Sequence, residues 1–471
     1  MKLLSLTGAC LLSLFVGNVF AHSLPDGTFV ADETYPPSGR TDSVPSSISG
    51  QFLPEPSGAW TLQDCLDYAL ENNIQIKKSK ITQLSGLEDT RLAKAQLFPS
   101  LSASVTQGYV NYPSADAVSN NSYSGNYSVN ANWTLFDAGR RTQTIKQQKI
   151  QNHVDELSIE QNEDDIRISL VQTYLQVMYA IEAVRINENT VEVSKAQRDR
   201  AEELLKAGSI SQVDFAQLES QYSADKYQLV VAQTNLDNYK LQLKQLLEFD
   251  INQDIRLAPL TLTEAEVMAP LPDKQTIYAT SLAVMPEIKS SRLAIEIAEL
   301  EKKKAKSGYF PTLSANAGIG TGHLSGTGYA FGSQVWNKFN ESVGLTISVP
   351  IFSNRENKTA YHKAKLAITT SELEWLNTQK QLLKTVEGIY LDATSAQNQY
   401  ISAMERLRSV EQSYQLTEQQ FFLGMKNTLE LLTEKNNLLS ARQEVLQSKY
   451  MAVMSIQLLN IYQKKPVEIN Y

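Results

Sequence analysis

Apolar residues in two long stretches of this chain recur every seven positions. The first stretch spans 140–206 and the second 355–423, and neither contains a proline. The repeated positions are Leu170, Tyr174, Val177, Ile181, Val184 and Val191 in the first, and Val386, Ala393, Tyr400, Leu407, Tyr414 and Phe421 in the second. A seven-residue repeat predicts helices supercoiled along a narrow seam. Each helix would rise roughly 100 Å at 1.5 Å per residue.

A glycine and a new helix start follow each long stretch. Gly208 and Gly424 are placed to end the long helices, as glycine does at a helix C-terminus. Ser211 with Asp214, and Asn427 with Glu430, then have the spacing of a capping box. Further helices are predicted over 62–96 and 212–249. Each is about half the length of the long helix, so two of them stacked end to end would match it.

A strict alternation of apolar and polar residues predicts four strands, at about 100–112, 122–136, 312–322 and 340–352. The apolar face carries Tyr127, Val129, Trp133 and Leu135, and, in the last strand, Val343, Leu345 and Ile347. Strands with one apolar, aromatic-rich face and one small polar face are typical of outer-membrane barrels. A half-buried sheet of a soluble domain is the alternative. We favour the barrel because no other element offers apolar surface to cover that face. The glycine-rich stretch 320–332 is predicted to be an exposed loop between strands.

An internal repeat divides the chain into two similar halves. The hexapeptide 98–103, Phe-Pro-Ser-Leu-Ser-Ala, recurs at 310–315 as Phe-Pro-Thr-Leu-Ser-Ala. Both copies enter a strand pair. We therefore predict one domain over 59–465, made of two structural repeats, 59–250 and 274–465, with a connecting segment at 251–273.

Four strands cannot close a membrane barrel, since the smallest common barrels have about eight. Closure must therefore come from several copies of the chain. Three copies would give about twelve strands and two copies about eight, and both numbers are even. Counting alone leaves the two assemblies open, and closure of either ring would remove the unpaired strand edges.

The N-terminus has the features of a secretory signal peptide over 1–21, with a lysine, an apolar run and a small-x-Ala cleavage site. Residues 22–58 are rich in proline, serine and glycine and are expected to form a flexible extension. Cleavage would leave Cys65 as the sole cysteine, so no intramolecular disulfide is expected. No later stretch is apolar enough for a transmembrane helix, which leaves a closed barrel as the way to span a membrane.

Charge and composition exclude several kinds of protein. The formal net charge of −8 argues against a nucleic-acid partner, which requires a basic surface. The four histidines are scattered, with no pair at metal-ligand spacing. We therefore expect no catalytic residues, metal or cofactor, as is usual for a channel that works by its shape and lining charge.

Three motifs together resemble the TolC-type outer-membrane factors, over about 60–463. They are the segment 60–73 that starts with Trp-Thr-Leu-Gln-Asp, the repeated Phe-Pro-Ser/Thr-Leu-Ser, and the Leu-Phe-Asp-Ala-Gly-Arg-Arg of 135–141. The resemblance implies a homotrimer with a mixed α/β fold. A twelve-stranded β-barrel, four strands from each protomer, would lie in outer-membrane lipid and continue as a long periplasmic α-helical coiled-coil barrel.

The resemblance also implies a function and partners. The trimer would be the exit duct of a tripartite efflux pump or a type I secretion system. A periplasmic adaptor (membrane fusion) protein would link it to an inner-membrane RND, MFS or ABC transporter. The helix-hairpin tips around Gly208, Ser209, Gly424 and Met425 would meet that adaptor. The sequence does not identify the substrate or the partner pump.

Candidate gate residues follow from the same resemblance. Glu430 matches one acidic residue that narrows the pore, Asp214 lies at the equivalent turn of the first half, and Thr433 replaces a second acidic residue. Lys426 and Phe421 match, with altered side chains, a basic and an aromatic residue that latch the closed tip. Helix capping is the simpler role for Asp214 and Glu430, and the two roles are compatible. Mutual repulsion in a ring of three Glu430 carboxylates is expected to raise their pKa values.

Two other functions remain open from the pattern alone. A periplasmic adaptor would have one coiled-coil hairpin flanked by compact β-domains, whereas this chain predicts two hairpins. A soluble coiled-coil scaffold without a pore would leave the apolar strand faces unexplained.

Overall fold

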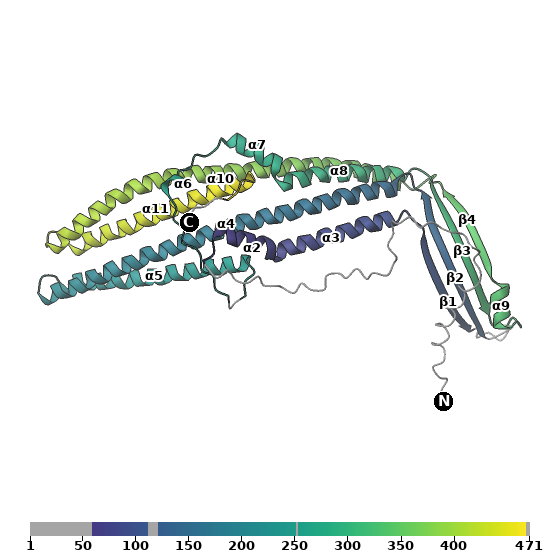
Figure 1. Cartoon of the computed structure of the whole chain (residues 1–471), viewed down its shortest axis with the longest axis horizontal. Coiled ribbons are helices and arrows are strands. Elements are labelled where there is room, and N and C mark those ends of the chain that lie inside the picture. The colour runs from purple at the N-terminus through teal and green to yellow at the C-terminus, as the bar shows by residue number, and fades with distance from the viewer. Residues whose placement is uncertain (1–58, 112–120, 251–252, 468–471) are drawn as a thin grey trace, which may run out of the picture. The chain divides into compact units, whose positions relative to one another are not determined.

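The computed structural model describes residues 59–111, 121–250 and 253–467. The predicted signal peptide, 1–21, and the predicted extension, 22–58, lie outside these residues. The described part consists of long helices and one four-stranded sheet (Figure 1).

Two uninterrupted helices dominate the fold. Helices α4 (Arg140–Lys206) and α10 (Glu356–Phe422) have 67 residues each. The predicted apolar seams are mostly buried, and in α10 every predicted position is buried except Leu407, which is partly buried. In α4 the prediction was wrong for Ile181, which is 39% exposed. The length of both helices follows from the absence of proline and from continuous packing along the seam.

The predicted single helix at 62–96 is two helices, α2 (Leu62–Asn72) and α3 (Ile74–Ala95). Asn73 interrupts them with a ψ of 130°, and its side chain accepts a hydrogen bond from the Gln75 amide. The same break recurs in the second half, between α7 (Lys274–Val284) and α8 (Pro286–Ser307). There the residue before Pro286 is extended, as residues before proline usually are.

The remaining helices complete two antiparallel hairpins. Helix α5 (Gln212–Leu246) folds back on α4, and α11 (Thr428–Tyr462) folds back on α10. The connection between the halves contains the short helix α6 (Glu264–Val267). Within the described residues, no helix combines the length and apolar character needed to cross a membrane.

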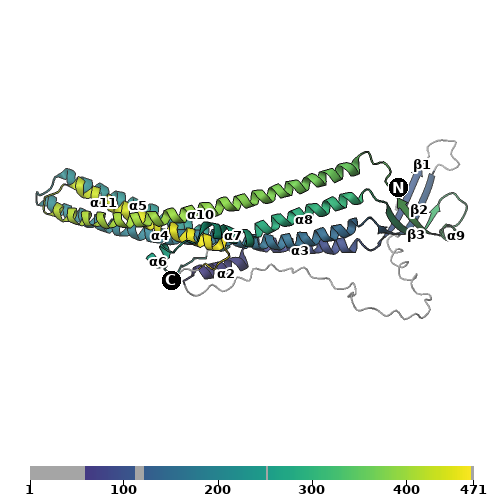
Figure 2. The same cartoon turned by 90° about the horizontal axis from the view of Figure 1, so that it is seen from above.

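The helices form a single curved layer whose order changes along its length (Figure 2). Beside the sheet, α3 packs on α4, α4 on α8 and α8 on α10. Toward the hairpin turns, α5 packs on α4, α4 on α11 and α11 on α10. Helix α10 therefore lies at one edge throughout, and α3 and then α5 lie at the other.

The sheet is an antiparallel meander in the order β1-β2-β3-β4. Its strands are β1 (Ser100–Asn111), β2 (Asn121–Phe136), β3 (Thr312–Leu324) and β4 (Asn340–Ser348). Strand β4 is shorter than predicted and ends before Pro350, which has no backbone N–H to donate. The stretch 320–332, predicted as a loop, is one only at 325–330: it begins with the end of β3 and ends with the start of helix α9 (Phe331–Asn337).

The register brings most apolar strand positions to one face, whereas Val110 and Leu324 pair with serines of the opposite face and Leu135 lies at a bulge. Val129 pairs with Ala103 on one side and Ile319 on the other, and Leu345 pairs with Ala315. The opposite face carries rungs of small polar residues, such as Ser104, Ser128 and Gly320. The hydroxyls of Ser104 and Ser128 are 2.8 Å apart. The sheet thus separates an apolar surface from a hydrophilic one.

The largest buried cluster joins the start of the chain to the middle of both hairpins. Trp60, Tyr68 and Phe249 contact one another edge to face, with ring centroids 5.3–5.4 Å apart. Leu170 and Tyr174 of α4 are fully buried in the same cluster. This packing fixes the connection between the halves to the long helices, and the hairpin turns extend beyond it.

Candidate functional site

Both hairpin turns depend on a glycine in the left-handed region. Gly208 has φ +75° and Gly424 has φ +74°. Beyond each glycine the next amide reaches back to the helix: Ser209 donates to the Leu204 carbonyl at 2.8 Å, and Met425 to the Gln420 carbonyl at 2.9 Å. This closing pattern satisfies the last carbonyls of the helix. The side chains of Ser209 and Met425 are exposed at the tips.

A capping box restarts each hairpin. The Asp214 amide donates to the Ser211 hydroxyl at 3.1 Å, and the Glu430 amide donates to the Asn427 side-chain oxygen at 2.9 Å. In return each carboxylate accepts from the amide of its cap residue. The capping role predicted for Asp214 and Glu430 is therefore present in both halves.

Asp214 also links the two hairpins. The buried hydroxyl of Thr428, at the start of α11, donates to Asp214 Oδ1 at 2.8 Å. Hydrogen bonds from Ser211 and then from Thr428 lower the pKa of the Asp214 carboxyl. Asp214 is therefore ionised at neutral pH, and the contact holds the first turns of α5 and α11 together.

Glu430 is paired within its own turn. Lys426 donates to Glu430 Oε1 across one helical turn, and both side chains are half-exposed. This hydrogen bond, followed by that from the Asn427 amide, lowers the pKa of Glu430. The rise in pKa expected for a ring of three Glu430 carboxylates concerns the trimer and stays a prediction, while in the single protomer Lys426 stabilises the carboxylate.

The other candidate gate residues make local contacts. Thr433 donates its hydroxyl to the Leu429 carbonyl at 2.7 Å and is exposed. Phe421 is buried against Phe422, with ring centroids 5.5 Å apart. Lys426 pairs with Glu430 and Phe421 contacts Phe422, and the latch that the resemblance implied stays a prediction.

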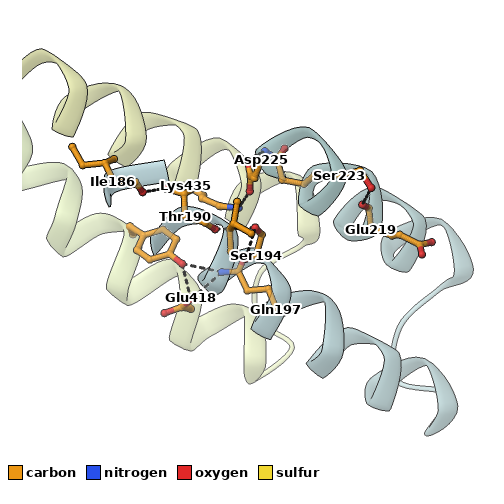
Figure 3. Close-up of polar contacts among 12 residues, drawn as sticks. Ile186, Thr190, Ser194, Gln197, Glu219, Ser223, Asp225, Glu418 and Lys435 are labelled. Carbon is orange, nitrogen blue, oxygen red and sulfur yellow. Dashed lines mark hydrogen bonds and ion pairs between the residues drawn. The ribbon is translucent and has the colours of Figure 1, made fainter. Parts of the chain in front are cut away.

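The hairpins are instead tied by residues that the sequence did not single out. Lys435 of α11 forms an ion pair with Asp225 of α5 (Figure 3), and the two side chains are only 5% and 4% exposed. Gln221 donates a second hydrogen bond to Asp225 at 2.8 Å. Burial lowers the pKa of Lys435, and the contact with Asp225 opposes that shift. A pair this well covered is costly to separate.

A second tie joins the long helices themselves. The Gln197 side-chain amide of α4 donates to the Tyr414 hydroxyl at 2.8 Å and to Glu418 at 3.0 Å (Figure 3). Tyr414 in turn donates to Glu418 at 2.6 Å. Burial, together with the neighbouring carboxylate, raises the pKa of Tyr414. The two hairpins are thus held together by specific polar contacts around a small apolar cluster.

At the other end of the helices, the apolar face of the sheet is exposed in the single chain. Val343 is 87% exposed, and Leu345 and Ile347 are about as open. Trp133 and Leu135 are also exposed, and Tyr127 and Val129 are half-buried. A soluble protein rarely leaves a continuous apolar surface of this kind uncovered.

Chemically reactive groups are sparse in the part of the chain that the structure describes. No group of histidine, cysteine, aspartate and glutamate side chains there has the geometry to hold a metal ion. Cys65 is fully buried, and burial raises its pKa to about 12, so the thiol is protonated and unreactive at neutral pH.

Comparison with known proteins identifies the family to which this architecture belongs. The model of the outer membrane efflux protein family matches residues 65–247 and again 277–460. The outer membrane protein TolC of Escherichia coli is 20% identical over 84% of this chain and 80% of its own length. The proteases secretion protein PrtF of Dickeya chrysanthemi is 20% identical over 83% of this chain and 85% of its own length.

A solved structure of CusC, described as forming a transmembrane channel, superposes with a TM-score of 0.73. It covers 86% of this chain and 92% of that one at 18% identity. The likeness confirms the predicted fold class, with barrel strands continued by long coiled-coil helices. Because the family model matches both halves, the chain belongs to the outer membrane efflux protein family, and it is an outer-membrane channel of the efflux and type I secretion kind rather than an enzyme.

Proposed function

We propose that three copies of this chain close into one continuous tube, which serves as the exit duct for a periplasmic adaptor and an inner-membrane transporter. The observation that carries this proposal is that both the sheet and the helix layer of the protomer have two uncovered edges, and that these two edges differ from each other. A surface whose two edges differ can close only head to tail, and head-to-tail contacts form a ring when the rotation closes.

The sheet supplies the first pair of edges. β1 and β4 lie at the ends of the four-strand order, so each has one side without a strand partner within the described residues. Pairing β1 of one copy with β4 of the next satisfies those backbone groups, which lipid cannot do. Three copies give about twelve strands, within the range of known outer-membrane barrels.

The helices supply matching edges. Large apolar side chains are exposed on α3, α5 and α10, the helices at the edges of the layer. They include Ile74, Ile81, Leu84 and Leu92 of α3, Val213, Tyr227, Val230 and Leu241 of α5, and Leu366, Leu373, Leu391, Ile401, Met404 and Leu416 of α10. Burying these rows between copies would extend the coiled-coil packing around the ring.

Cysteine cross-linking tests this arrangement. Leu84 is 56% exposed and Leu366 is 68% exposed, and they lie at similar distances from the strands on opposite edges. The Leu84→Cys, Leu366→Cys double variant should give covalent dimers and trimers on oxidation in membranes. Each single variant is the matched control and should stay monomeric on denaturing gels, as Cys65 is buried. Only monomers from the double variant would refute the ring.

The hairpin tips are the proposed docking surface for the adaptor. They are the end of α4 and α10 away from the sheet, which places them deepest in the periplasm once the sheet is in the outer membrane. Exposed Leu423 and Met425 give the second tip an apolar contact surface. The proposal assigns no class of transported molecule, since the relatives include both a TolC protein and a protease secretion protein.

Replacing the turn glycines should weaken adaptor docking. A Cβ at Gly208 or Gly424 would meet no atom within 4 Å, so the cost arises from the positive φ alone, about 1–2 kcal/mol per turn. The Gly208→Val, Gly424→Val variant should still form trimers but recover less adaptor after cross-linking of intact cells. Gly388→Val, at an uncrowded position inside α10, is the control. Normal adaptor recovery by the double variant would place the docking surface elsewhere.

The charges at the tip should set ion selectivity. In a trimer three Glu430 carboxylates face one axis, each partly neutralised by Lys426. Glu430→Gln should weaken cation selectivity, whereas Lys426→Gln should strengthen it. Reversal potentials in planar bilayers under a salt gradient measure both. Opposite shifts are expected; unchanged potentials in both variants would leave capping as the only role of Glu430.

The pH dependence of the same conductance gives a further test. The folded-state pKa values of Asp214 and Glu430 are lowered, so their contribution to tip stability is present at neutral pH and is lost as pH falls through those values. Channel opening should therefore increase below pH about 4, the usual carboxyl range. In Asp214→Asn this increase should be smaller. A gate that opens between pH about 6 and 7 would point to another group.

A further inference from the structure

Helix α9, in the connection between β3 and β4, lies on the apolar face of the sheet. The Phe331 ring is 4.8 Å from the ring of His323, and the Thr321 hydroxyl donates to the Val335 carbonyl. Thr321 pairs with Tyr127 in the register, so these side chains belong to the same face as the proposed lipid-facing residues. The helix covers the outer end of that face, away from the long helices (Figure 1).

A buried glutamine holds α9 in place. Gln334 is 9% exposed; its Oε1 accepts from the Leu324 amide at 2.8 Å and its Nε2 donates to the Tyr329 carbonyl at 2.9 Å. Gly125 leaves room for the His323 ring that contacts Phe331, since a Cβ at Gly125 would lie 2.2 Å from that ring. The two hydrogen bonds satisfy the Gln334 side-chain amide internally, as an apolar environment requires.

Large apolar side chains are exposed on α9 and on the residues just before and after it. Trp336 follows Gln334 by two residues, so it points about 200° around the helix, away from the sheet. Trp336 is 82% exposed, and Phe339 and Tyr329 are 53% and 69% exposed. Lys338 lies between Trp336 and Phe339 in the sequence and is also exposed. A rigid element with exposed aromatic rings and a lysine suits a lipid headgroup boundary.

A second aromatic group marks the other edge of the apolar face. Trp133 donates its indole N–H to the Leu97 carbonyl at 2.8 Å, and Phe98 and Phe136 are exposed near it. Tyr123, which contacts His323 at 5.3 Å, lies at the level of α9. At about 3.4 Å per residue and a tilt of about 40°, the β2 segment from Tyr123 to Trp133 spans about 26 Å. This matches the apolar band of roughly 25 Å in outer-membrane barrels.

We propose that α9 is a membrane anchor, in which Trp336 and Phe339 insert at the boundary between hydrocarbon and headgroups of the outer leaflet. The anchor sets the depth of the barrel, opposite the boundary at Trp133. This inference rests on the proposed lipid-facing sheet. Continuity with that face and the match of the spacing to bilayer thickness favour lipid over a protein as the occupant.

Tryptophan quenching by spin-labelled lipids tests the anchor. The full-length protein has four tryptophans, and of these Trp336 and Trp133 are placed at lipid boundaries. In lipid vesicles, quenching by nitroxides at the headgroup should fall by about half in Trp336→Phe and by a similar share in Trp133→Phe. Nitroxides in the middle of the acyl chain should quench Trp336 less than headgroup nitroxides do.

The two variants separate the anchor from the proposed function. If Trp336→Phe leaves headgroup quenching unchanged while Trp133→Phe lowers it, α9 lies in water or awaits a protein partner, and the anchor is overturned. If neither change affects quenching, the lipid-facing sheet itself is wrong. Gln334→Leu should release α9 and lower the quenching of Trp336 while trimers persist; full quenching in that variant would contradict the fixed position of the helix.

Discussion

Leu345→Arg should abolish the trimer, whereas Thr346→Arg should leave it intact. The two residues are neighbours in β4 on opposite faces: Leu345 pairs with Ala315 on the apolar face, and Thr346 with Ser314 on the polar one. An arginine facing lipid costs up to about 2–4 kcal/mol, the full amount applying at mid-depth, and each copy of the chain adds the same penalty. An arginine facing the lumen stays in water.

Mild-detergent gels and membrane fractionation measure this outcome. Two single variants, Trp133→Arg and Thr134→Arg, repeat the comparison in β2. There Trp133 pairs with Ala315 of β3, and Thr134 pairs with Ser314. Trp133 and Leu345 both pair with Ala315, so they lie in one rung of the sheet, and arginines at the two positions should have similar effects. Equal assembly of Leu345→Arg and Thr346→Arg would show that the apolar face does not contact lipid.

Lys435→Met should destabilise the hairpins strongly, because it leaves the buried Asp225 carboxylate without a partner. Removing one member of a buried ion pair costs about 3–5 kcal/mol, whereas replacing both by apolar residues is often neutral. The Asp225→Val, Lys435→Met variant should therefore recover most of the lost stability. Lys426→Met removes an ion pair from a half-exposed site and is the matched control, with little expected change.

Thermal loss of the helical circular dichroism signal in detergent measures these differences, and planar-bilayer conductance shows whether the hairpins separate. The single variant should unfold at lower temperature and open more often than wild type. If the double variant is as unstable as Lys435→Met, volume or shape rather than the unpaired charge explains the loss.

The long helices were predictable because their determinants are local and repeated. A stretch without proline and with an apolar residue at every seventh position has few other ways to bury its seam. The strand faces were predictable for the same reason, since alternation assigns each residue to a side. The helix break at Asn73 was missed, although Met285–Pro286 in the second repeat carries a clear signal for it.

Contacts between hairpins were not predictable from one sequence. A heptad indicates which side of a helix is buried, but it does not say which residue of another helix lies at the same height. In the sequence, Asp225 and Lys435 therefore do not differ from other charged residues, and only the fold shows that they form a pair. Helix α9 was missed because seven residues in a glycine-rich stretch carry little periodicity, and the helix is held by tertiary contacts of Gln334. The roles proposed for Glu430 and the tip residues stay predictions.

Single-channel recording of the detergent-purified protein in planar lipid bilayers shows directly whether this chain forms a pore. We expect discrete conductance steps that are cation-selective, because the chain carries a formal net charge of −8. The steps should appear with wild-type protein and disappear with Leu345→Arg. A wild-type protein that binds the bilayer yet produces no conductance steps at any concentration or voltage would contradict the claim that this chain forms a channel.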